Sequence, residues 1–350
     1  MTTVVLAANN GDVGGGEVML LATARALVDL GVDVEVAGPR ADGGVLDQAA
    51  ALGLPVHDFP GDRRAYMSGL RRWSVDRPDW LWCHGLVPAL ATSGRRRRIV
   101  HLHQAPAPAH RGPARVARLR AEAVVVPSQS MARAVPGAEV LWNWTHPVSL
   151  PLSTLRGGPL RIGFIGRLSA DKGVHVLAEA VGLLEERHPG RQRLVLAGDS
   201  RFVPDDQRDR VRTALAHVEP VTDALGWVER RDFFSAVDLA VFPSTWQEPF
   251  GLVLAEAMSS RTPVVVSDAG ALPEVVGPDH PWVVAPGDPA ALADAIDVVS
   301  TAHPSVVEDV VDAAQRRWTE SFSPDAGRAR VAALAARLGL ISPDLGASTS

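Results

Sequence analysis

The chain has 350 residues, of which 46% are hydrophobic and 21% charged, the balance of a globular protein and not of a disordered one. This length is typical of two domains. No apolar run is long enough to cross a membrane, and the N-terminus lacks the basic leader of an export signal. A single cysteine, Cys83, excludes an intramolecular disulfide and suits a reducing compartment. We therefore expect a cytoplasmic protein.

The formal net charge of −5 is unevenly distributed. Basic residues outnumber acidic ones in residues 1–150, and the reverse holds in the rest of the chain. The N-terminal half therefore suits an anionic or membrane-borne partner better than the C-terminal half does. The basic excess is smaller than is usual for a nucleic-acid-binding protein, so no nucleic-acid partner is expected.

Short apolar runs alternate with helical stretches along the whole chain, which predicts parallel sheets with crossover helices. In the first half we expect a helix over residues 17–30, which ends at a glycine, and strands over residues 3–8, 32–37, 56–59, 80–83, 99–103, 123–127 and 140–142. Residues 147–159 are rich in Pro, Ser and Gly and lack periodicity, so they are the best candidate for a linker.

The same alternation starts again after this segment. Strands are expected over residues 160–165, 194–197, 224–227, 239–242, 264–267 and 282–284, and helices over residues 173–187, 206–217, 250–259, 289–301, 305–318 and 324–338. The domains expected from this pattern are residues 1–150, 151–322, a C-terminal helical segment over 323–340, and a flexible tail over 341–350. Two doubly wound domains of this kind bind ligands at the carboxyl ends of their strands.

Two glycine-containing segments lie where a strand is followed by a helix. Gly14-Gly15-Gly16-Glu17 opens the first helix, where backbone N–H groups can approach a phosphate. A tight turn is the alternative, and the dinucleotide pattern G-x-G-x-x-G is absent. The second segment runs from Gly166 to Gly173 and contains Arg167 and Lys172, two cations suited to a diphosphate. Lys172 is the only lysine in the chain, which suggests that a compact ammonium is needed there.

A third segment, residues 246–258, places two glutamates, Glu248 and Glu256, eight positions apart. Glu248 is expected in the loop before a helix and Glu256 about two turns inside it, roughly 12 Å apart by helical rise. That separation is close to the distance from the ribose of a nucleotide to its attached sugar. The N–H groups near Gly251, Leu252 and Val253 would then face the diphosphate.

These segments resemble family 4 glycosyltransferases, which have the GT-B fold of two Rossmann-like domains facing across a cleft. The resemblance covers nearly the whole chain. It is carried by Glu248-x₇-Glu256 with its Pro249-Phe250-Gly251 core, by the glycine motif at residues 14–17, by residues 163–173, by the turn at residues 268–274 and by residues 285–292. One departure is residues 143–146, Asn-Trp-Thr-His, where the family often has Asn-Gly-Val-Asp.

The resemblance implies a retaining, metal-independent hexosyltransferase that uses a nucleotide-diphosphate sugar, with UDP favoured over GDP. Its donor site would comprise Gly15, Gly16, Arg167, Lys172, Glu248, Phe250, Gly251, Leu252, Val253 and Glu256. Glu256 would hold the ribose and Glu248 the sugar hydroxyls, while Arg167 and Lys172 would neutralise the leaving diphosphate. The N-terminal domain would bind the acceptor, a small molecule, a glycan or a lipid-linked substrate, and the last helix would pack back on that domain. No separate cofactor is expected.

Two histidines, His84 and His103, end strands of the first domain. His103 matches the histidine that the family places against the donor sugar, and it completes the expected catalytic set with Glu248, Arg167 and Lys172. A structural role is the more common one for a strand-end histidine. His101 and His103 share a strand face and suggest metal ligation, but no third ligand follows from the sequence, so no metal is expected.

Arginines gather in the run at residues 95–98 and in the series Arg111, Arg115, Arg118 and Arg120. On one helix face, that series could contact anionic lipid headgroups at the inner membrane face or a phosphate-bearing acceptor. A solvated face is the alternative and the more common role.

Three other functions stay open at this point. A nucleotide-sugar epimerase on the same fold would convert the donor without an acceptor. A two-lobed sugar-binding protein would lack catalysis. The missing export signal and the paired cations Arg167 and Lys172 argue against this alternative. A nicotinamide-dependent oxidoreductase is disfavoured because its glycine fingerprint is absent.

Overall fold

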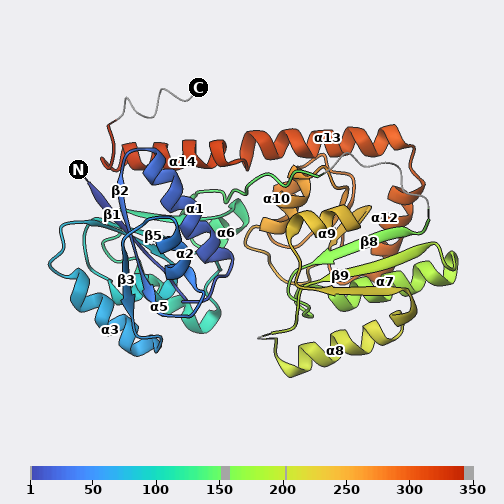
Figure 1. Cartoon of the computed structure of the whole chain (residues 1–350), viewed down its shortest axis with the longest axis horizontal. Helices are drawn as coiled ribbons and strands as arrows, with labels where there is room; N and C mark the ends of the chain where they lie inside the picture. Colours follow the sequence, from blue (N-terminus) through green and yellow to red (C-terminus); the bar gives the residue numbers. More distant parts are fainter. Residues whose placement is uncertain (1, 151–157, 202, 343–350) are drawn as a thin grey trace. The chain divides into compact units, whose positions relative to one another are not determined.

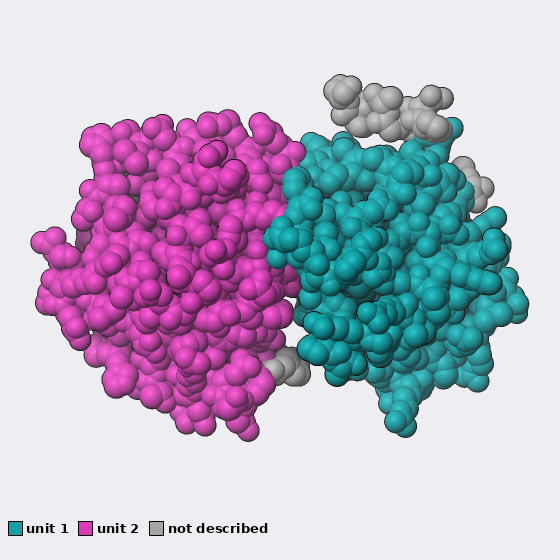
Figure 2. Space-filling model, turned by 180° about the vertical axis from the view of Figure 1, so that it is seen from behind, with its two compact units in different colours: residues 1–144, 324–350 teal, residues 145–323 magenta. Residues whose placement is uncertain are grey.

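The computed structural model describes residues 2–150, 158–201 and 203–342. The chain forms two compact units, one of residues 1–144 and 324–350 and the other of residues 145–323, drawn in separate colours in Figure 2. The linker expected at residues 147–159 and the tail expected at 341–350 lie partly outside the described residues.

In the first unit, a seven-stranded parallel sheet runs in the order β3-β2-β1-β4-β5-β6-β7 within the described residues. Its strands are β1 (Thr3–Ala7), β2 (Asp33–Pro39), β3 (Val56–Phe59), β4 (Trp80–His84), β5 (Arg98–His101), β6 (Ala123–Val126) and β7 (Glu139–Val140). The helices are α1 (Gly15–Asp29), α2 (Val45–Ala51), α3 (Arg63–Ser74), α4 (Leu86–Ala91), α5 (Arg111–Ala117), α6 (Gln129–Ala134) and α14 (Pro324–Arg337) (Figure 1).

The second unit contains a parallel sheet in the order β10-β9-β8-β11-β12-β13. Its strands are β8 (Leu160–Ile165), β9 (Gln192–Ala197), β10 (Thr222–Gly226), β11 (Leu239–Phe242), β12 (Val264–Ser267) and β13 (Val283–Val284). Its helices are α7 (Val174–Arg187), α8 (Asp205–Ala216), α9 (Arg230–Ala236), α10 (Leu252–Ser259), α11 (Leu272–Val276), α12 (Pro289–Thr301) and α13 (Pro304–Ser321). Two parallel sheets with crossover helices confirm the expected pair of Rossmann-like domains.

The strand order of each sheet reverses once, and this reversal fixes where a ligand can bind. In the first sheet β1 lies between β2 and β4, and in the second β8 lies between β9 and β11. At such a point the two crossover connections leave on opposite sides and open a crevice at the carboxyl ends of the strands. The central strands are almost fully buried, as their continuous apolar sequences require, whereas the edge strands β3, β7, β10 and β13 are partly or mostly exposed.

Helix α14 belongs to the first unit although it is about 180 residues further along the chain than the rest of that unit. It packs against α1, and Gly327 lies directly on the indole ring of Trp144. The guanidinium of Arg330 lies 5.8 Å from the ring centroid of Trp142, and burial lowers its pKa to about 10. The departure at residues 143–146 therefore includes an indole, that of Trp144, against which the last helix packs.

Substitution of Gly327 by alanine is expected to lower the free energy of unfolding by about 1–3 kcal/mol, because overpacking of a buried contact strains it. An added Cβ would lie 2.2 Å from a ring carbon of Trp144. Gly182, in the middle of α7, is a matched control because its Cβ would meet only an ordinary contact at 3.7 Å. Gly182→Ala should stabilise slightly through helix propensity. Thermal and urea unfolding of both variants should give opposite signs; equal shifts would contradict the packing of α14 on Trp144.

Candidate functional site

The turn between β8 and α7 brings the cationic residues of the second unit to the carboxyl end of its sheet. Gly173 caps α7 with φ of +74°, and a Cβ there would lie 1.8 Å from the carbonyl oxygen of Pro243. Only glycine fits this close approach between the turn and the end of β11. The turn therefore holds Lys172 beside the residues that follow β11.

Lys172 and Glu248 form the centre of this site. The Lys172 ammonium donates to Glu248 Oε1 at 2.5 Å, and the hydroxyl of Ser244 donates to the same oxygen at 2.5 Å. The Glu248 side chain is 7% exposed and that of Lys172 26% exposed. The ammonium also lies 5.5 Å from the ring centroid of Trp246. A nearly buried carboxylate is thus held by one cation and one hydroxyl, as its desolvation requires.

Arg167 lies in the same turn but extends further into solvent. Its guanidinium donates to Asp171 at 2.7 Å, and its side chain is 44% exposed. The hydroxyl of Ser169 also donates to Asp171. Arg167 is therefore a partly exposed cation held near the end of β8 by a local carboxylate.

Helix α10 begins at Leu252 and not at the expected residue 250, because Gly251 precedes it in the left-handed region with φ of +100°. Leu252 and Val253 form the first turn, where backbone N–H groups lack helical acceptors. Phe250 is buried and meets Phe322 edge-on, with ring centroids 5.3 Å apart. The Phe250 side chain therefore packs in the core, and only its backbone could meet a donor.

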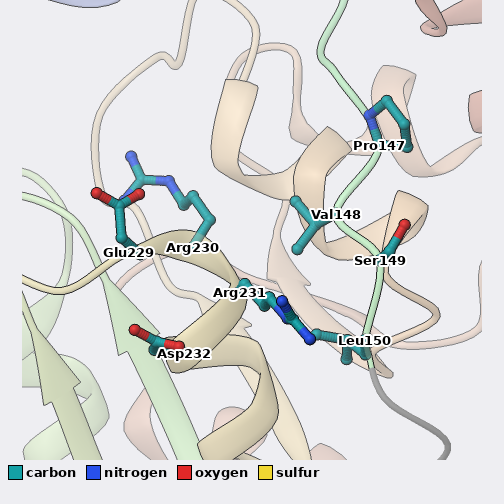
Figure 3. Close-up of a pocket in the computed structure, with 8 residues that line it drawn as sticks. All are labelled: Pro147, Val148, Ser149, Leu150, Glu229, Arg230, Arg231 and Asp232. Carbon is teal, nitrogen blue, oxygen red and sulfur yellow. The ribbon is translucent and has the colours of Figure 1, made fainter.

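Glu256 lies on the fifth residue of α10 and pairs with Arg230 at 2.7 Å. Burial raises the pKa of the Glu256 carboxyl, while the charge and hydrogen bond of Arg230 lower it. Arg230 also lines a pocket of about 670 Å³ together with Glu229, Arg231, Asp232 and residues 147–150 (Figure 3). The pair joins α9 to α10 at one side of this pocket.

In the first unit, the glycine motif meets His103. Because Gly16 has no side chain, its backbone can lie close to the imidazole of His103; a Cβ on Gly16 would be only 3.1 Å from that ring. Gly15 is the first residue of α1. The carboxylate of Glu17 accepts from the backbone N–H groups of Asn10 and Gly14, at 3.1 and 3.2 Å, and burial raises its pKa. Glu17 therefore holds the loop that places the glycines.

His103 lies beyond the end of β5, so it does not share a strand with His101 as the sequence suggested. Its Nε2 is 3.0 Å from Nδ1 of His84, and the two rings stack with centroids 5.2 Å apart. Burial lowers the pKa of His103 to about 4, so the ring is neutral at pH 7. The pairing with His84 could not be read from the sequence.

The structure brings the predicted site residues together in separate groups. Arg167, Lys172 and Glu248 lie at the reversal point of the second sheet, with Glu256 further along α10. Gly15 and Gly16 lie at the reversal point of the first sheet, and His103, which follows β5, lies against Gly16. Sequence reasoning missed two direct partners of the glutamates, Ser244 and Arg230. Ser244 could have been suspected from its place directly after a strand, but Arg230 gave no signal.

The arginine clusters differ from the expectation of a charged face. Arg98 is fully buried and donates to the carbonyl oxygens of Ala89, Ala117 and Leu119, so it is part of the core of the first unit. Arg95 likewise donates to the backbone carbonyls of Ser74 and Arg77.

The series of arginines after residue 110 does not share one helix. Helix α5 contains Arg111 and Arg115 but ends at Ala117, Arg118 donates to the carbonyl of Pro136, and Arg120 has φ of +60°. The expected single basic helix face is therefore wrong. Among the residues that the structure describes, no helix has the length and apolar character needed to cross a membrane.

Comparison with known protein families assigns both halves of the chain. The family model described as Glycosyltransferase Family 4 matches residues 13–138, and the model described as Glycosyl transferases group 1 matches residues 159–301. The boundary between the two matches falls between residues 138 and 159, close to where the two units divide.

Relatives of known description are also glycosyltransferases. The glycogen synthase of Mycobacterium tuberculosis is 35% identical over 174 residues, which are 48% of this chain and 40% of that protein. The match thus spans two-fifths of the length of that relative. A D-inositol 3-phosphate glycosyltransferase of Xylanimonas cellulosilytica is 29% identical over 82% of this chain and 83% of its own length.

Solved structures share the fold across nearly the whole chain. HepE of Anabaena, solved in complex with UDP-glucose, superimposes with a TM-score of 0.82 at 20% identity and covers 96% of this chain and 100% of its own. Sucrose-phosphate synthase from Thermosynechococcus elongatus gives a TM-score of 0.77 at 16% identity, with 97% and 100% covered.

Proposed function

Because this chain belongs to the glycosyltransferases of the GT-B fold, we propose that it moves a hexosyl unit from a nucleoside-diphosphate sugar to an acceptor hydroxyl. Transfer retains the anomeric configuration and needs no metal ion or other cofactor. The observation that carries the proposal is the cluster of Lys172, Glu248 and Ser244 at the reversal point of the second sheet. UDP is the proposed nucleotide, which is also the nucleotide in the HepE complexes.

In the proposed complex, each charged group of the site exchanges a protein partner for part of the donor. The ribose hydroxyls replace Arg230 as hydrogen-bond donors to the Glu256 carboxylate, and the hydroxyls of the sugar donate to the Glu248 carboxylate. Lys172 then turns to the diphosphate, together with Arg167 and the N–H groups of the first turn of α10. These groups supply the positive field that a metal ion would otherwise provide as the leaving group gains charge.

The first unit is proposed to supply the acceptor side. His103, partly exposed and neutral, would contact the donor sugar through a ring nitrogen, with Gly16 permitting close approach of the backbone. The acceptor is a small molecule, a glycan or a lipid-linked substrate that offers a hydroxyl. Its oxygen attacks the anomeric carbon on the face from which the diphosphate leaves, and the hydroxyl proton passes to the departing phosphate oxygen.

Turnover of UDP-glucose is expected to continue in excess EDTA, with UDP released in step with a glycosylated acceptor. The sequence contains no D-x-D triplet to hold a metal–diphosphate complex, and Lys172, Arg167 and α10 offer positive charge instead. Release of UDP and the stereochemistry of the product can be followed by NMR with and without EDTA. Loss of activity in EDTA that manganese restores would contradict metal independence. Sugar isomerisation without an acceptor would favour an epimerase.

A further inference from the structure

Three histidines converge at the carboxyl ends of two neighbouring strands of the first sheet. His84 ends β4 and His101 ends β5, where the two residues are register partners, and His103 follows two positions later. Ring centroids are 5.0 Å apart between His84 and His101 and 4.0 Å apart between His101 and His103. One ring nitrogen of each residue lies within 4.8 Å of the others.

Most of the ring nitrogens in this cluster have no protein partner. Within the described residues, the buried nitrogens without a hydrogen bond include both of His101, Nε2 of His84 and Nδ1 of His103. The remaining two pair with each other, His84 Nδ1 with His103 Nε2. Buried polar groups are nearly always satisfied. Each neutral imidazole carries one N–H and one lone pair, so some of these four nitrogens carry free lone pairs, and the cluster points to a ligand that accepts them.

The chemistry of the cluster defines the ligand. We propose that His84, His101 and His103 bind Zn²⁺ through one nitrogen each, with the fourth position left to water or a substrate oxygen. Three imidazoles and an open position form a common zinc environment, with Zn–N distances of about 2.0–2.1 Å. Such distances place ligand nitrogens about 3.3 Å apart. One nitrogen of each histidine already lies within 4.8 Å of the others.

The three rings are not equally buried. His84 and His101 are fully buried, whereas His103 is partly exposed and lies against Gly16. The open coordination position therefore lies on the His103 side, towards the glycine motif.

One consequence rests on the proposed function. If His103 contacts the donor sugar, zinc at its nitrogen removes that contact, and micromolar Zn²⁺ inhibits transfer. Magnesium does not inhibit, because it binds oxygen ligands and not imidazole. Binding of the metal itself does not depend on this role, so the two proposals can fail separately.

Direct metal binding tests the site. The full chain, stripped with EDTA and dialysed, is titrated with Co²⁺ while visible absorption is recorded, and Zn²⁺ is then added as a competitor. A Co²⁺ band that saturates at about one equivalent and is displaced by Zn²⁺ is the expected result. Absence of a saturating band, together with no Zn²⁺ binding by calorimetry, overturns the proposal.

Two variants locate the metal. His101→Phe keeps an aromatic ring in the core but removes a ligand, and it should weaken Zn²⁺ binding at least about 100-fold. The control is His57→Asn in the same unit, because His57 pairs with Glu35 and could itself attract metal; its Zn²⁺ affinity should stay within about twofold. Unchanged affinity in His101→Phe overturns the site. Should that variant fail to fold, X-ray absorption of the Zn²⁺-loaded wild type counts the imidazole ligands, and fewer than three overturns it equally.

Discussion

Lys172→Arg is expected to lower kcat/KM for sugar transfer by roughly 10- to 1000-fold, or about 1.4–4 kcal/mol, while the fold is kept. The ammonium lies in a narrow position between Glu248 and the ring of Trp246, beside the turn that Gly173 holds against Pro243. A planar guanidinium is larger and its donors form a fixed fork, so it cannot reach the same diphosphate oxygen from this turn. Because the leaving group gains charge as the bond breaks, a misplaced cation harms the transition state most.

The control for this variant is Arg187→Lys, which also exchanges one cation for another in the second unit. Arg187 pairs with Asp294 and Asp297 on the surface, away from the reversal point of the sheet. Its kinetics should match the wild type within about twofold. Both variants are compared by transfer kinetics and by melting temperature. A Lys172→Arg enzyme with wild-type activity would show that the diphosphate site lies elsewhere.

Glu256→Gln and Glu248→Gln are expected to separate nucleotide binding from sugar transfer. Loss of the charged acceptor at Glu256 should weaken UDP binding about 10- to 100-fold, the value of a hydrogen bond to a charged group. Glu248→Gln should leave the affinity for UDP within about threefold but reduce kcat/KM for UDP-glucose about 100-fold or more. The reason is position, since Glu248 precedes α10 beside Lys172 and Glu256 lies within the helix beside Arg230.

Calorimetry with UDP alone decides between these roles, followed by transfer kinetics with UDP-glucose. Glutamine keeps the side-chain size, and the melting temperature of each variant controls for the loss of its ion pair with Lys172 or Arg230. Equal losses of UDP affinity in both variants would contradict the division of labour. So would a Glu248→Gln enzyme with unchanged transfer.

The sequence predicted the fold well because the central strands of each sheet are buried on both faces. Such strands appear as uninterrupted apolar runs, and each predicted run became a strand with ends within a few residues. The helices of the first unit between residues 45 and 134 were not predicted, because they are short and their apolar faces are interrupted. The burial of Arg98 could not be predicted either, because nothing in a run of arginines indicates that backbone carbonyls will surround one of them.

The candidate site was predicted as a set of residues but not as a set of contacts. Lys172 and Glu248 are 76 positions apart in the chain, and no local sequence pattern predicts that they pair. The start of α10 was also misplaced, because the positive φ of Gly251 ends the preceding turn. Glu256 therefore lies nearer the start of its helix than the spacing suggested. A third histidine, His84, was noted at a strand end, yet its approach to His103 depends on the pairing of β4 with β5.

Each cation of the proposed donor site already has a carboxylate partner, and this arrangement would limit what can bind there. Lys172 is neutralised by Glu248, Arg167 by Asp171 and Arg230 by Glu256. Cations without carboxylate partners would bind anions unselectively, including any abundant phosphate ester. At this site an anion without hydroxyl groups would have to break the ion pairs and leave partly buried carboxylates without a cation, which costs desolvation free energy. A ligand that carries both hydroxyl groups and phosphates would bind the carboxylate and the cation of each pair, so the proposed site would select such a ligand before any chemistry begins.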